Sequence, residues 1–229
     1  LILLYMYLPE TRKGQDIQVK VVLRDYVQLL SSLRFIQSSF IPTLLAGGYM
    51  AFISVIPFLY RDKLGMPLSQ FAWHQAAIIA SFSLMSYYAN RISSYFGDIR
   101  SALFGGLLSV CATTALLICS SLVNIPSVFF ITPLMCLFAG SCAIPFAVIF
   151  SASLSVVPEK NGPASSLLMS IRTLFCAFTV QFAGYMYNGA LFSAAAIVAF
   201  SCLISLLLTI GFYRGKVKTT LPLLQNVAH

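Results

Sequence analysis

Four long stretches of this chain contain no charged residue. They cover positions 35–60, 64–90, 101–158 and 173–213, which is 26, 27, 58 and 41 residues in turn. A helix that crosses the hydrocarbon core of a bilayer needs about 20 consecutive, mostly apolar residues. Each shorter stretch can therefore hold one such helix, and each longer stretch can hold two. The sequence predicts six transmembrane helices.

Turn-forming residues divide the two longer stretches. The tetrapeptide Asn124-Ile125-Pro126-Ser127 interrupts one, and the pair Asn188-Gly189 interrupts the other. The fold class predicted from this pattern is all-α and integral to the membrane. Its six helices are expected at 35–59, 68–89, 101–123, 127–156, 163–187 and 190–213.

The composition excludes an ordinary soluble domain. Of the 229 residues, 59% are apolar and 9% are charged, whereas about 25% are charged in a typical soluble domain. Six acidic and fourteen basic side chains cannot cover the surface of a water-soluble fold of this size. The apolar fraction is also too high for a disordered chain.

The chain opens with eight apolar residues followed by Pro9 and Glu10. Eight residues cannot span a bilayer, and no basic region precedes them as in a signal peptide. Residues 1–8 are therefore expected to end a transmembrane helix that begins further upstream, with an apolar N-terminal anchor as the alternative. Residues 9–34 then form a segment between two membrane domains, 35–213 the six-helix bundle, and 214–229 a tail.

The basic residues are divided unequally between the two sides of the predicted membrane domain. Eleven lie in the 9–34 segment, the 91–100 loop, the loop at Lys160 and the tail, whereas the other side holds only Arg61 and Lys63. Cytoplasmic loops are enriched in Lys and Arg. We therefore expect a multi-pass protein of the cell inner (plasma) membrane with a cytoplasmic C-terminus. The net charge of +8 follows from this topology, so no nucleic-acid partner is needed to explain it.

Short motifs accompany the six spans. They are Leu8-Pro9-Glu10-Thr11 before basic residues, Gly47-Gly48-Tyr49, Ser54-Val55-Ile56-Pro57-Phe58, and Asn161-Gly162-Pro163-Ala164-Ser165-Ser166-Leu167. With this topology, the chain resembles the C-terminal half of a major facilitator superfamily transporter. In the motifs it resembles the bacterial drug-resistance members of the Bcr/CflA type. The resemblance implies one half of a twelve-helix bundle, with the N-terminal half upstream as a partner.

The function implied by this resemblance is secondary active transport, most closely proton-coupled efflux of drugs or small lipophilic metabolites by alternating access. The lipid bilayer, a small-molecule substrate and protons are then the partners, and no cofactor is expected. All six acidic residues lie in loops, so a proton-coupling carboxylate would belong to the upstream half. A metabolite or siderophore carrier of the same superfamily and a truncated six-span protein without transport activity are the alternatives.

In this superfamily the first and fourth helices of each half line the central cavity, and here they are 35–59 and 127–156. The candidates for the cavity wall are Gln37, Tyr49, Phe52, Ser54, Met135, Phe138, Cys142 and Phe146. Such an aromatic and sulfur-containing wall suits lipophilic or amphipathic substrates. Plain helix packing is the alternative for each of these residues.

The cytoplasmic gating motif of the superfamily is altered in this chain. Ser86 stands where the motif has Gly, and Asn90 stands where it has Asp, but the basic residue is kept as Arg91. Arg91 is expected either to take part in gating or to anchor the helix at the cytoplasmic edge.

No enzyme chemistry is apparent in the sequence. There is no paired carboxylate within a span, no Ser-His-Asp set and no glycine-rich phosphate loop. All six cysteines lie within predicted spans without a CxxC pair, which is typical of small buried residues and not of a metal site. His74, next to Trp73 at a membrane edge, is expected to be an interfacial residue.

Arg172 is the only charged residue well inside a predicted span. Counted from Pro163 it lies nine residues in, or about 13 Å along a helix axis, close to the middle of a hydrocarbon core about 30 Å thick. A charge at this depth usually faces the bundle interior or a wet cavity. Arg172 is expected either to pair with another group and hold one access state, or to snorkel to the cytoplasmic interface.

The unequal distribution of basic residues predicts which positions can be labelled from outside the cell. In a cysteine-free background, a membrane-impermeant maleimide added to intact cells should modify a cysteine at Ser69. A cysteine at Thr219 should react only after the cells are opened, because eleven basic residues hold its side in the cytoplasm. Modification of the Thr219 variant in intact cells would contradict this topology.

Overall fold

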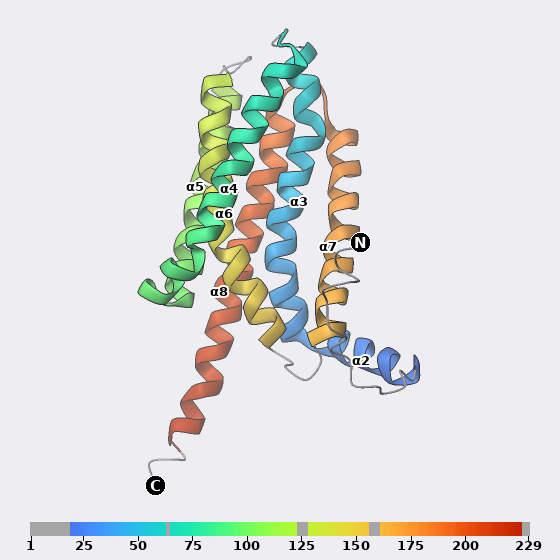
Figure 1. The fold of residues 1–229 in the computed structure, drawn as a ribbon, viewed down its shortest axis with the longest axis vertical. Helices are drawn as coiled ribbons and strands as arrows, with labels where there is room; N and C mark the ends of the chain where they lie inside the picture. The colour runs from blue at the N-terminus through green and yellow to red at the C-terminus, as the bar shows by residue number, and fades with distance from the viewer. Residues whose placement is uncertain (1–18, 63–64, 123–127, 156–160, 226–229) are drawn as a thin grey trace, which may run out of the picture.

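The structure, a computed structural model, describes residues 19–62, 65–122, 128–155 and 161–225. Within these ranges the chain is almost entirely helical (Figure 1). The helices are α2 (Val19–Ser31), α3 (Leu33–Asp62), α4 (Leu68–Phe96), α5 (Asp98–Leu122), α6 (Val128–Ser155), α7 (Asn161–Met186) and α8 (Leu191–Gln225). The six predicted spans fall in order on α3 to α8. The prediction for residues 1–8 lies outside the described residues.

Five of the described helices are long and apolar enough to cross a membrane. These segments are Leu33–Asp62, Asp98–Ser120, Val128–Leu154, Gly162–Met186 and Leu191–Arg214. The chain is therefore an all-helical membrane protein. Helix α4 has 29 residues but is less apolar, so length and composition support five of the six predicted spans.

The lower apolarity of α4 comes partly from side chains that bond to its neighbour α6. The Ser81 hydroxyl donates a hydrogen bond to the Cys136 carbonyl oxygen at 2.8 Å, and the Thr132 hydroxyl lies 2.9 Å from Nδ1 of His74. Trp73, by contrast, has 79% of its surface exposed. These polar groups of α4 are thus hydrogen-bonded to α6 within the bundle.

The predicted loop at residues 91–100 is helical except at one residue, which corrects the sequence prediction. Helix α4 continues to Phe96, and α5 begins at Asp98. Between them Gly97 has φ of 82°, a conformation that side chains with a Cβ rarely adopt. Its N–H donates to the Ser93 carbonyl oxygen at 2.8 Å, and the Ser93 hydroxyl donates to the Asp98 carboxylate. The charged residues that suggested a loop are accommodated by exposed helix ends.

The six long helices pack as two equivalent groups of three. Helix α3 packs mainly against α7 and α8, and α6 packs mainly against α4 and α5. Helices α3 and α6 also meet each other, as do α5 and α8. Exchanging α3 with α6, α4 with α7 and α5 with α8 reproduces this pattern. Since the exchanged helices run in opposite directions (Figure 1), α3–α5 and α6–α8 are two inverted repeats of three helices each.

A short motif in the sequence follows the same repeat. Leu44-Leu45-Ala46-Gly47-Gly48 in α3 corresponds to Leu137-Phe138-Ala139-Gly140-Ser141 in α6, 93 positions later. A Cβ at Gly47 would lie 2.7 Å from the Phe175 ring of α7, and one at Gly140 would lie 2.9 Å from the Ser81 hydroxyl of α4. The two glycines therefore perform the same task in the two repeats, which is close approach of a neighbouring helix.

The position after each of these glycines meets the other neighbour. A Cβ at Gly48 would lie 3.1 Å from Cβ of Ser201 in α8. At the equivalent place on α6, the Ser141 carbonyl oxygen and Cδ of Pro145 would each lie 2.7 Å from a Cβ at Gly105 of α5. Helices α3 and α6 thus each pack closely against two neighbouring helices at adjacent small residues.

The α5–α6 crossing should not tolerate an added methyl group. Gly105→Ala places its Cβ against a backbone carbonyl and a proline ring, neither of which can rotate away, so we expect a loss of about 1–3 kcal/mol in the free energy of unfolding. The control is Gly184→Ala in α7, where nothing lies within 4 Å of the added Cβ. Thermal unfolding in detergent should separate the two variants. Equal melting temperatures would show that α5 and α6 are not packed this closely.

Candidate functional site

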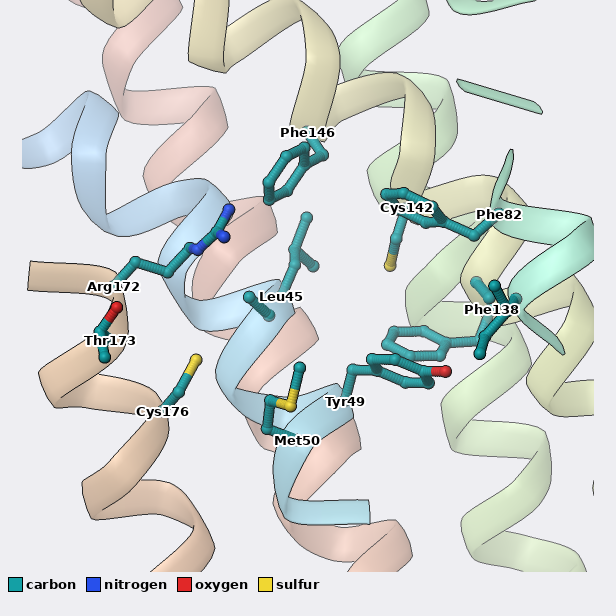
Figure 2. Close-up of a pocket in the computed structure, with 13 residues that line it drawn as sticks. Leu45, Tyr49, Met50, Phe82, Phe138, Cys142, Phe146, Arg172, Thr173 and Cys176 are labelled. Atoms are coloured by element: carbon teal, nitrogen blue, oxygen red, sulfur yellow. The ribbon is translucent and has the colours of Figure 1, made fainter. Parts of the chain in front are cut away.

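A cavity of about 550 Å³ lies between α3, α4, α6 and α7 (Figure 2). Helix α3 contributes Leu45, Ala46, Tyr49 and Met50, and α6 contributes Phe138, Ala139, Cys142 and Phe146. The other lining residues are Ile79 and Phe82 of α4, and Arg172, Thr173 and Cys176 of α7. This volume is in the range of sites that hold small organic molecules.

The cavity lies at the centre of the inverted repeat. Four pairs of its lining residues are 93 positions apart, which is the spacing of the repeated glycine motif. They are Leu45 and Phe138, Ala46 and Ala139, Tyr49 and Cys142, and Ile79 and Arg172. Both repeats therefore build the same wall, with different side chains at equivalent positions.

Aromatic rings form one side of the cavity around Phe146. Its ring lies 6.1 Å from the Phe82 ring in an edge-to-face arrangement and 6.2 Å from the Phe150 ring in a stacked one, measured between centroids. Both are favourable geometries for aromatic pairs. Phe146 is thus held between α4 and the next turn of its own helix, which fixes the face that it presents to the cavity.

Arg172 reaches from α7 toward that face (Figure 2). Its guanidinium carbon lies 5.6 Å from the centre of the Phe146 ring, within the range of a cation–π contact. Arg172 is one of the residues that line the cavity. No carboxylate lines the cavity, and the described acidic residues Asp25, Asp62 and Asp98 belong to α2 or to helix ends.

Tyr49 supplies a second polar group to the cavity. The side-chain amide of Gln75 in α4 donates a hydrogen bond to the Tyr49 hydroxyl oxygen at 2.7 Å. The Tyr49 ring lies 6.4 Å from the Phe138 ring, tilted by 45°. Because the hydroxyl accepts from Gln75, its own proton is available for donation toward the cavity.

Of the predicted cavity residues, Tyr49, Phe138, Cys142 and Phe146 line the cavity. Phe52 and Met135 do not, although they are buried in the same core cluster as Phe138 and Cys142. They lie on the same face of the same helices as the lining residues, one turn further from the cavity. The sequence identified two of the four lining helices but not how far along each helix the cavity extends.

Three other predicted residues also lie away from the cavity. Gln37 donates from its amide to the Leu208 carbonyl oxygen at 3.0 Å, which ties α3 to α8. The Ser54 hydroxyl donates to a backbone carbonyl of its own helix at 2.8 Å. Arg91 is exposed near the C-terminal end of α4. Gln37 therefore acts in helix packing, and the structure shows no cavity contact for Ser54 or Arg91.

The sequence prediction missed the lining residues contributed by α4 and most of those from α7. Ile79, Phe82, Thr173 and Cys176 lie on helices that the resemblance did not assign to the cavity. The signal that could have found them is the 93-residue repeat, which relates Ile79 to Arg172. In the described parts of the chain, no group of three or more His, Cys, Asp or Glu side chains could hold a metal ion.

In comparisons with known proteins, no family model, no curated protein and no solved structure matches the chain. The site is therefore defined by its own geometry. It is an apolar and aromatic cavity inside an inverted three-helix repeat of a membrane protein, and Arg172 is its one charged lining residue.

This geometry predicts that Arg172 lowers the stability of the protein. A central Arg costs about 2.5–3.5 kcal/mol on insertion scales, and a cation–π contact returns about 0.5–2 kcal/mol. Arg172→Ile, which copies the residue at the repeat-related position 79, should therefore raise the free energy of unfolding by about 1 kcal/mol or more.

Reversible unfolding in lipid bilayers would measure this difference. The matched control is Arg61→Ile at an exposed helix end, which should change stability by less than about 0.5 kcal/mol. A marked loss of stability in Arg172→Ile would show that the guanidinium holds the fold together.

Proposed function

We propose that this chain is one six-helix half of a secondary active transporter of the major facilitator type. The observation that carries the proposal is a cavity at the centre of an inverted three-helix repeat, lined equally by both repeats. Transporters of this class bind substrates where such repeats meet, near the middle of the membrane. The transported molecule is a drug-like or metabolite-sized compound with a lipophilic part, which the aromatic wall would accept.

The uneven burial of the helices supports a second half that covers this cavity. In the most apolar 18-residue stretch of each helix, 67% of the residues are buried in α3 but only 17% in α7. Helix α4 packs mainly on α6, and α7 packs mainly on α3. The face formed by α4 and α7 is therefore the natural place for the upstream half to dock and close the cavity.

Within this proposal α4 also crosses the membrane and brings the number of spans to six. Its 29 residues would extend about 43 Å as a helix, which exceeds the thickness of the hydrocarbon core. Trp73 and Tyr87 are both exposed and lie toward opposite ends of α4, as expected for aromatic residues at the two interfaces of a membrane.

The proposed orientation places the C-terminus in the cytoplasm and the protein in the cell inner membrane. Helix α2, the start of α3 and the C-terminal part of α8 all lie toward one end of the bundle (Figure 1). Arg24, Arg34 and Arg214 belong to these elements, whereas Arg61 is at the far end of α3. This distribution matches the excess of basic residues on cytoplasmic sides.

Internal prolines in two of the helices that line the cavity support alternating access. Helices α3 and α6, which are equivalent in the repeat, each contain two internal prolines, Pro42 and Pro57 in α3 and Pro133 and Pro145 in α6. A proline within a transmembrane helix removes one backbone hydrogen bond and permits bending. Bending of these two helices would open the cavity to one side at a time.

Proton coupling is part of the proposal, with the titrating carboxylate in the upstream half. The cavity wall of this half contains Arg172 but no Asp, Glu or His. A proton-driven exporter needs a titratable group on its transport path. The described half would then supply the substrate wall and a fixed positive charge.

Efflux by the intact protein tests the transport function. In everted membrane vesicles energised by a proton gradient, the intact protein should accumulate a lipophilic dye, and a protonophore should abolish the accumulation. Arg172→Ala should abolish transport while the protein still inserts, and Arg172→Lys should lose most of it, because an ammonium group cannot reproduce the planar fork of guanidinium.

The control for this experiment is Arg61→Lys, which changes an exposed basic residue outside the cavity and should transport normally. Vesicles with well-inserted protein that show no protonophore-sensitive movement of any of a panel of lipophilic cations, anions and neutral dyes would contradict the proposed function.

A further inference from the structure

We propose that the cavity binds a small amphipathic anion, with its carboxylate or sulfonate group on the Arg172 guanidinium and its apolar body against the aromatic wall. The biological meaning of this inference rests on the proposed transport function. The binding site itself rests on the geometry around Arg172, and the two can be tested separately.

The first step in the argument is that the fold does not need a charge at this position. Arg172 corresponds in the repeat to Ile79, which lines the same cavity from α4. An apolar residue therefore satisfies the architecture at the equivalent place. Since an intramembrane Arg is costly, its presence on one side only indicates a role other than packing.

The second step concerns which atoms of Arg172 remain available. The guanidinium carbon lies over the Phe146 ring, 5.6 Å from its centre, and this cation–π contact provides no oxygen acceptor for the N–H groups of Arg172. The N–H donors lie in the plane of the guanidinium, and two of them can bind a carboxylate side by side. Phe146 thus contacts the guanidinium, while the N–H donors of Arg172 remain for a ligand.

The third step is the sign of the charge that the cavity can accept. Among its lining residues Arg172 carries a positive charge and none carries a negative one. A guanidinium stays protonated at any physiological pH, so it cannot become neutral inside the apolar wall. An anionic ligand would neutralise it, whereas a cationic ligand would add a second unpaired charge to a site of low polarity.

The remaining wall defines the body of the ligand. Leu45, Met50, Phe138 and Phe146 surround the space between Arg172 and Tyr49 (Figure 2). A volume of about 550 Å³ accommodates one or two fused rings with short substituents. The Tyr49 hydroxyl, on the side of the cavity away from Arg172 (Figure 2), can donate to a second polar group of the ligand.

Binding to the purified intact protein in neutral phosphatidylcholine nanodiscs tests the proposal. The probes are radiolabelled 2-naphthoate, the uncharged 2-naphthylmethanol and the cationic 2-naphthylmethylammonium, which share one ring system. The wild type should bind naphthoate at least about tenfold more tightly than either analogue, as expected for a charge-assisted bidentate contact.

Two variants assign the effect to the guanidinium. Arg172→Gln should weaken naphthoate binding about tenfold or more and leave naphthylmethanol binding unchanged, which also shows that the cavity is still formed. Arg172→Lys should retain part of the preference for the anion, because it keeps a point charge without the fork. Arg61→Gln, at an exposed helix end, should bind all three probes as the wild type does.

An anionic lipid could supply the same chemistry through its phosphate group, so the measurement is repeated in nanodiscs with about half phosphatidylglycerol. Unchanged naphthoate affinity supports a small-molecule site, and a severalfold loss would assign the cavity to lipid and overturn the proposal. It is also overturned if the ammonium probe binds as tightly as naphthoate, if Arg172→Gln binds naphthoate normally, or if the wild type binds no naphthoate at ~1 mM.

The outcome for transport is independent of these results. If Arg172→Gln loses dye efflux but keeps anion-selective binding, Arg172 pairs with another group of the protein, and the ligand proposal fails while the transport function stands. If binding is anion-selective and depends on Arg172 but no vesicle transport occurs, the ligand site stands and the transport function fails.

Discussion

The fold depends on the close approach of neighbouring helices to α3 and α6 at adjacent small residues. In lipid, helices gain little from hydrophobic burial against one another, so van der Waals contact between closely spaced backbones has to hold them. Gly47 and Gly140 admit α7 and α4, and these two helices form the outer walls of the cavity. The same contacts that join the two repeats therefore set the width of the site.

The cavity brings together two opposing requirements, stability and an unpaired positive charge. Its wall is made of leucine, methionine and phenylalanine side chains, which lipid-exposed helices readily supply, but Arg172 has no acidic partner within that wall. The Phe146 ring compensates part of the cost and, held by Phe82 and Phe150, keeps the guanidinium in one place. A cost that the protein itself leaves uncompensated is available as binding energy for a ligand of opposite charge.

The helices were predictable from sequence because charge-free runs report the thickness of the membrane directly. The faces of the helices were less predictable, since apolar residues surround each helix and leave little periodic signal. Phe52 and Phe138 both belong to the buried core, yet only Phe138 also lines the cavity. A charge within a predicted span singles out Arg172 in the sequence, but its contact with Phe146 depends on how α6 and α7 lie in space, which a single sequence does not contain.

The sparse burial of α7 has a consequence for the synthesis of the protein. This helix has the lowest mean hydropathy of the five apolar spans, 1.4, and it carries Arg172. Its main contacts are with α3, which leaves the ribosome more than 100 residues earlier. Of the five spans, α7 therefore gains the least from its own apolarity when it enters the membrane, and its main packing partner α3 is already made by then.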